Sequence, residues 1–67
     1  MDADIKGALR QLDKSWKAFE HKGRPLTKLQ VKGILMYGIF KGYKSTSEFT
    51  DEEVDGLLFP NKEKSSN

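Results

Sequence analysis

The chain has 67 residues, a formal net charge of +2 and no cysteine, so neither a disulfide nor thiolate-bound zinc can stabilise it. A chain of this length forms one small domain that depends on its hydrophobic core or on a second copy of itself. No run of apolar residues approaches the roughly 20 that a membrane-spanning helix needs, and the acidic N-terminus lacks the apolar segment of a signal peptide. We therefore expect a cytoplasmic protein without a membrane partner.

The charges are distributed unevenly along the chain. Between residues 5 and 44 there are ten Lys or Arg against two acids, whereas between residues 45 and 58 there are five acids and no base. Such a dipolar layout can steer a charged partner or favour self-association.

The first predicted helix runs from about Ala3 to His21. Its apolar residues recur at the 4-3-4-3 spacing of one helical face: Ile5, Leu9, Leu12, Trp16 and Phe19. Asp2 is expected to be the N-cap, and Gly23 is placed to take the left-handed conformation that ends a helix. Arg24-Pro25 should then lead the chain away in an extended conformation.

The second predicted helix begins after Thr27 and runs to about Lys41, where Gly42 ends it. Thr27 and Gln30 form a capping box, flanked by the hydrophobic staple of Leu26 and Val31. Apolar residues lie all around this helix, which is typical of a helix buried on several sides. Gly33 and Gly38 weaken a helix, so we expect another backbone to approach them closely.

The third predicted helix is short, from Asp51 to about Leu58, and Thr50 and Glu53 form its capping box. Residues 61–67 are polar and are expected to form a disordered tail. The sequence therefore predicts an all-α, three-helix domain over residues 1–60, with the second helix in the centre. It leaves open a homodimer built on the first two helices.

Catalytic and metal-binding patterns are lacking in this sequence. The single histidine, His21, is expected at a helix C-terminus, where a cation is an ordinary cap. The acids at the start of the third helix lack the alternating spacing and the glycine of a calcium loop. We therefore expect no enzymatic activity, no cofactor and no metal site.

Two sets of residues are candidates for binding a partner. The basic set begins with a stripe along the first helix and continues in the turn that follows: Lys6, Arg10, Lys14, Lys17, Lys22, Arg24 and Lys28. The apolar set exceeds what one long and one short helix can cover: Trp16, Met36, Tyr37, Phe40 and Tyr43. The plainer interpretation is that the basic residues form a solvated face and that most of the apolar residues belong to the core.

These features favour a small, non-enzymatic protein-interaction module, such as an adaptor, an inhibitor or a regulatory subunit. It would bind a protein partner through apolar faces of the first two helices, rimmed by the basic stripe. The alternative is a non-specific nucleic-acid-binding protein that contacts phosphates through the first helix and the basic turn. A sequence-reading helix-turn-helix is disfavoured, because its second helix would present acids to the duplex.

Overall fold

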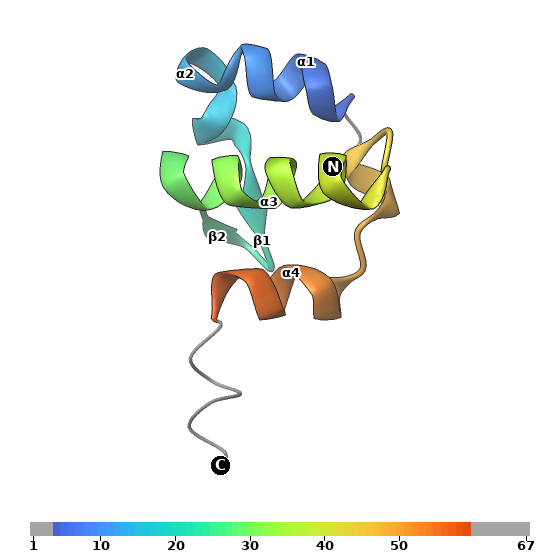
Figure 1. Cartoon of the computed structure of the whole chain (residues 1–67). Helices are drawn as coiled ribbons and strands as arrows, with labels where there is room; N and C mark the ends of the chain where they lie inside the picture. Colours follow the sequence, from blue (N-terminus) through green and yellow to red (C-terminus); the bar gives the residue numbers. More distant parts are fainter. Residues whose placement is uncertain (1–3, 60–67) are drawn as a thin grey trace.

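The computed structural model describes residues 4–59 and is mostly helical, with one small two-stranded sheet (Figure 1). In chain order the elements are α1 (Ile5–Arg10), α2 (Leu12–Ser15), the 3-10 turn η1 (Trp16–Ala18), β1 (Glu20–His21), β2 (Arg24–Pro25), α3 (Lys28–Lys41), the 3-10 turn η2 (Thr46–Glu48) and α4 (Asp51–Leu58). The long helix α3 lies in the middle, with α1 and α2 along one side and α4 along the other (Figure 1). The predicted burial of this helix on several sides is wrong within the described residues, because Leu29, Met36 and Phe40 are exposed.

The first predicted helix is shorter and less regular than expected. Within the described residues it begins after Asp4, whose carboxylate caps the helix by accepting from the Gly7 amide at 3.0 Å; the expected cap, Asp2, lies outside them. The α-helix is interrupted at Gln11, and after Ser15 it tightens into the 3-10 turn η1. Phe19 is already extended, so the continuous helix predicted as far as His21 is wrong.

A β-hairpin occupies the place of the last predicted helical turn. Glu20 pairs with Pro25 and His21 with Arg24 in an antiparallel register. The two residues between the strands, Lys22 and Gly23, have φ angles of 56° and 78°, the pattern of a tight type I′ hairpin turn. Gly23 thus takes the predicted left-handed conformation, but it closes a hairpin instead of ending a helix.

The α3 helix is bounded as the sequence predicts. Thr27 Oγ1 accepts from the Gln30 amide at 3.2 Å, and the Gln30 side chain accepts from the Thr27 amide at 2.9 Å, which completes the capping box. At the other end Gly42 is the C-cap, with φ at 83°. Leu26 and Val31, the predicted staple residues, are both buried in the core.

The two glycines within α3 differ from each other and from the prediction. A Cβ at Gly38 would lie only 2.7 Å from Ile5 Cδ1 and from Phe49 Cζ, so Gly38 accommodates two side chains and not a neighbouring backbone. Nothing within residues 4–59 would lie within 4 Å of a Cβ at Gly33. Among the residues that the structure describes, the expected close approach at Gly33 is therefore wrong.

The C-terminal part begins with η2, in which Glu48 accepts from the backbone amides of Lys44 and Ser45. These two hydrogen bonds hold the pKa of Glu48 below its usual range. The predicted capping box of Thr50 and Glu53 is present at the start of α4, which ends at Leu58 as expected. The predicted disordered tail, residues 61–67, lies outside the described residues.

The core lies between α3 and the elements that surround it. Its buried members come from every part of the fold before residue 36: Ile5, Leu12, Phe19, Leu26, Val31, Ile34 and Leu35. From the other side α4 adds Val54, Leu57 and Leu58, which are only partly buried. Within residues 4–59, no helix combines the length and the apolar character that crossing a membrane requires.

Candidate protein-binding surface

The α3 helix has two apolar faces that point in opposite directions. Its inner face consists of Val31, Ile34, Leu35 and Gly38, which are all buried. Leu29, Met36 and Phe40 lie roughly half a turn away from them at 3.6 residues per turn. The helix therefore packs against the core with one face and presents the other to solvent.

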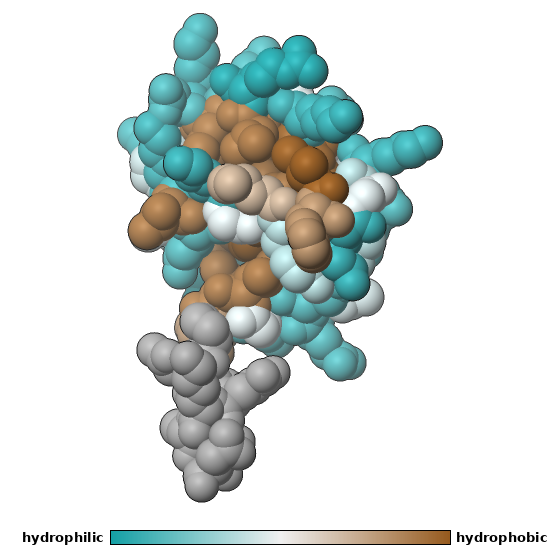
Figure 2. All heavy atoms as spheres, in the orientation of Figure 1, coloured by the Kyte–Doolittle hydropathy of each residue, from teal (hydrophilic) through white to brown (hydrophobic). Residues whose placement is uncertain are grey.

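We call the solvent-facing stripe formed by Leu29, Gly33, Met36 and Phe40 the outer seam. The side chains of Leu29 and Phe40 are 78% and 86% exposed, and Met36 is 52% exposed. Ile39 lies beside the seam and is also exposed. Figure 2 shows hydrophobic side chains gathered over α3 and between α3 and α1, with a hydrophilic border above them. Single exposed apolar residues are common, but a row of them on one helix is a candidate contact surface.

The charges around the outer seam have one sign. The α3 sequence contains three lysines and no acid. Lys28 forms an ion pair with Asp13, and the Lys41 ammonium lies 6.0 Å from the centre of the Tyr37 ring. Lys32 is exposed and makes no ion pair within the part of the chain that the structure describes. The rim of the seam is therefore basic.

The other three apolar candidates from the sequence are half-buried. Trp16 packs against the core. Tyr37 stacks on Phe49 at 6.3 Å between ring centres, and Tyr43 meets the same ring edge-on at 5.1 Å. Tyr43 also donates a hydrogen bond to Glu53 at 2.6 Å, and this bond, helped by burial, raises the pKa of Tyr43 to about 12. Tyr37 and Tyr43 thus connect α3 and the chain after it to Phe49 and α4, whereas Met36 and Phe40 are exposed.

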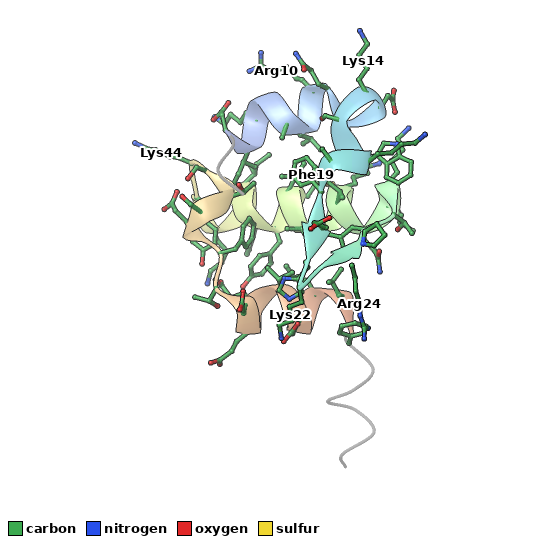
Figure 3. The ribbon with its side chains drawn as sticks, turned by 180° about the vertical axis from the view of Figure 1, so that it is seen from behind. Arg10, Lys14, Phe19, Lys22, Arg24 and Lys44 are labelled. Carbon is green, nitrogen blue, oxygen red and sulfur yellow. The ribbon has the colours of Figure 1, made fainter. Side chains whose placement is uncertain are left out.

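The seven basic candidates are all exposed but do not form one surface. Arg10 and Lys14 extend away from α3 at one end of the molecule, whereas Lys22 and Arg24 lie beside α4 at the opposite end (Figure 3). Lys6 and Lys17 belong to the first group by their positions on α1 and η1, and Lys17 stacks over Trp16 at 5.7 Å. Lys28 is tied to Asp13 of α2. The predicted stripe and the predicted basic turn are thus separate.

An ion-pair network joins the hairpin to α4. His21 Nε2 lies 2.8 Å from Oδ1 of Asp55, and Lys22 Nζ lies 2.8 Å from Oδ2 of the same carboxylate. The Lys22 hydrogen bond, followed by that of His21, holds the pKa of Asp55 below its usual value. His21 therefore serves as a partly buried link between two elements, and the predicted cap at a helix C-terminus is wrong.

This network predicts an acid-sensitive contribution to stability. The folded pKa of Asp55 lies below its ordinary value of 3.8, so its stabilising effect is complete above that value and is lost as the pH falls through the folded pKa. Asp55→Asn should lower the urea midpoint at neutral pH and lose less further stability than the parent chain below about pH 4. Parallel urea titrations followed by circular dichroism check this expectation.

Glu52→Gln is the matched control, because it removes the same charge from an exposed position on the same helix. We expect it to follow the parent chain closely at both pH values. An equal loss in the two variants would show that the general acidity of α4 matters and that the contact with the hairpin does not.

A cleft of about 450 Å³ opens where the hairpin and α4 approach α3. Its walls include the core side chains Phe19, Leu26 and Val31, and its rim includes His21. A ligand site needs polar groups placed to orient its ligand, and the His21 ring is already bonded to Asp55. Within residues 4–59 no three His, Cys, Asp or Glu side chains are grouped so that they could hold a metal ion. We assign no ligand to this cleft.

In comparisons with known proteins, no family model, curated protein or solved structure matches the chain. The outer seam is therefore the surface on which a functional argument rests. Sequence reasoning named Met36 and Phe40 but omitted Leu29, Ile39 and Lys32. The 4-3-4 spacing of Leu29, Gly33, Met36 and Phe40 is the signal that would have found the outer seam, although not Ile39 and Lys32 beside it.

Proposed function

We propose that this protein is a small protein-interaction module that binds a protein partner through the outer seam of α3. The observation that carries the proposal is the exposure of Leu29, Met36 and Phe40 on one side of a helix whose opposite side is buried. The core cluster includes none of these three side chains. Within residues 4–59, therefore, these three side chains take no part in the packing of the core.

The size of the seam suits a helix-mediated contact. Full burial of one large apolar side chain is worth roughly 1.5–3 kcal/mol, so two or three such residues can supply the central contacts of an interface. Phe40, as an exposed aromatic side chain, has the character of an interface anchor. A helix that is capped at both ends presents these residues in a fixed arrangement, which lowers the entropic cost of binding.

The distribution of cations favours a protein partner over nucleic acid. Phosphate binding along a duplex needs a continuous basic surface, whereas Arg10 and Lys14 lie at the opposite end of the molecule from Lys22 and Arg24 (Figure 3). Two of them, Lys22 and Lys28, are also paired with acids. In this proposal the lysines of α3 itself supply the basic rim of the seam.

Site-specific crosslinking tests the proposal in the cells from which the protein comes. With a photoreactive benzoylphenylalanine in place of Met36, we expect a discrete crosslinked protein that disappears when Phe40→Glu is added. The same photoreactive residue at Glu52, exposed on α4, is the control and should give no such product.

The absence of any crosslinked protein from position 36 would overturn the proposal. Anisotropy of a random DNA duplex at about 50 and 200 mM salt then tests the rival, because phosphate binding weakens steeply with salt. A product with the mass of two copies of this chain would identify the partner as a second copy and support a homodimer.

A further inference from the structure

We infer that the partner presents an amphipathic helix with an apolar stripe flanked by acidic residues, which lies along the outer seam with its backbone closest to α3 at Gly33. This inference rests on the proposed function, since it names the partner of the same surface.

The spacing of the seam is that of a helix that packs along another helix. Leu29, Gly33, Met36 and Phe40 follow one another at intervals of 4, 3 and 4 residues, which is the repeat that keeps one stripe facing a partner helix. If the partner made only one anchoring contact, apolar residues on a single turn of α3 would be sufficient. Here the stripe extends over about 16 Å at 1.5 Å per residue, so a partner helix of about three turns can follow it.

Gly33 marks the position of closest approach. It lies between two exposed apolar side chains of the seam, and the space above it is open, because no atom within residues 4–59 would lie within 4 Å of a Cβ there. Glycine weakens a helix relative to alanine, and packing within the described residues does not require it. A missing side chain between Leu29 and Met36 leaves a notch that admits the backbone or a large side chain of a partner.

The charges decide between a second copy and a different protein. Because α3 has three lysines and no acid, an α3 helix packed on that of a second copy would meet no acid on the facing helix in either orientation, and the acid that pairs with Lys28, Asp13, lies on α2 of the same chain. The acidic helix α4 of a second copy cannot act as the partner helix, because its apolar residues Val54, Leu57 and Leu58 already pack on the core of their own chain. Lys32 and Lys41 instead match acids that flank an apolar stripe on another protein.

Three synthetic helical peptides of about 14 residues, long enough to follow the seam, serve as probes. The first carries leucines at the 4-3-4 spacing with glutamates on both flanks. The second has lysines in place of the glutamates, and the third has serines in place of two leucines. Fluorescence anisotropy with the full chain should show binding of the first peptide at least about tenfold tighter than that of either other peptide.

Variants of the protein test each part of the inference. Lys32→Glu should weaken the binding of the acidic peptide and strengthen that of the basic peptide. Lys14→Glu, on α2 away from the seam (Figure 3), should leave the ratio of the two affinities unchanged. Phe40→Ser should weaken the binding of all three peptides. Gly33→Leu should also weaken the binding of the acidic peptide, because the new side chain fills the notch, although the fold itself becomes more stable. Tighter binding by Gly33→Leu would overturn the close approach at this position.

The two proposals fail in different ways. Equal affinity for the acidic and basic peptides, or no binding of either while position 36 crosslinks to a partner in cells, would overturn the acidic helix and leave the protein-binding function standing. Sedimentation equilibrium that shows a dimer abolished by Phe40→Glu would assign the seam to a second copy. A lack of crosslinks together with a lack of peptide binding would overturn both proposals.

Discussion

Leu35→Ala is expected to destabilise the protein by about 2–5 kcal/mol, the usual cost of truncating a fully buried leucine. Leu35 is 0% exposed at the centre of the inner face of α3. A chain of this length has a total stability of roughly 3–10 kcal/mol, so this one substitution should remove a large part of that stability. Urea titration followed by far-ultraviolet circular dichroism measures the effect.

Leu29→Ala is the matched control, because it makes the same chemical change on the same helix at a position that is 78% exposed. We expect it to change the free energy of unfolding by no more than about 0.5 kcal/mol. Comparable losses from the two variants would mean that Leu29 is buried in solution, either in this chain or in a stable dimer. The same experiment repeated at several protein concentrations separates these two cases, since only a dimer becomes more stable with concentration.

The ends of α3 and α4 were predictable because local chemistry determines them. Thr27 with Gln30, and Thr50 with Glu53, satisfy backbone amides that lie within three residues of each cap, so the sequence alone contains both partners of each hydrogen bond. The staple of Leu26 and Val31 also determines which side of α3 faces inward. Since Val31 is buried, the positions about half a turn away must face solvent, and the outer seam follows from this reasoning.

The hairpin was not predictable in the same way. Glycine after Lys22 is equally suited to the left-handed end of a helix and to the second position of a type I′ turn. The choice between them depends on tertiary contacts, including the link from His21 and Lys22 to Asp55, more than thirty residues further along the chain. Hydrophobic spacing could not reveal the change from helix to hairpin either. Phe19, the residue just before β1, is buried, as it would also be on the inner face of a helix.

The grouping of the basic residues on the surface could not be predicted from the sequence, because it depends on how distant elements are arranged in space. The pattern of Lys6, Arg10, Lys14 and Lys17 predicts one face on a straight helix, but the interruption at Gln11 and the 3-10 turn η1 bend that helix. Lys28 pairs with Asp13, fifteen residues before it. Counting charges along the sequence gives their number and sign, whereas their grouping on the surface depends on how the elements pack.

Gly38→Leu is the second substitution with a large expected effect. A Cβ at this position would already lie 2.7 Å from Ile5 Cδ1 and Phe49 Cζ, and leucine adds three further carbon atoms to the same space. Ile5 is completely buried, so it has little room to move. Overpacking of this kind costs about 1–3 kcal/mol or more, against a gain of up to about 1 kcal/mol from replacing glycine in a helix. Thermal unfolding should show a lower midpoint.

Gly33→Leu separates the packing cost from the helical gain, because it makes the same change five residues away, where the space is open. We expect it to raise the stability by up to about 1 kcal/mol, which corresponds to a rise of about 4–8 °C in the midpoint for a domain of this size. If both variants were destabilised, Gly33 would have a neighbour in solution, and α3 would be covered on its outer side even in the absence of a partner protein. If both were stabilised, Ile5 and Phe49 would not pack against Gly38, and the contact between α1 and α3 would have to be looser than the structure describes.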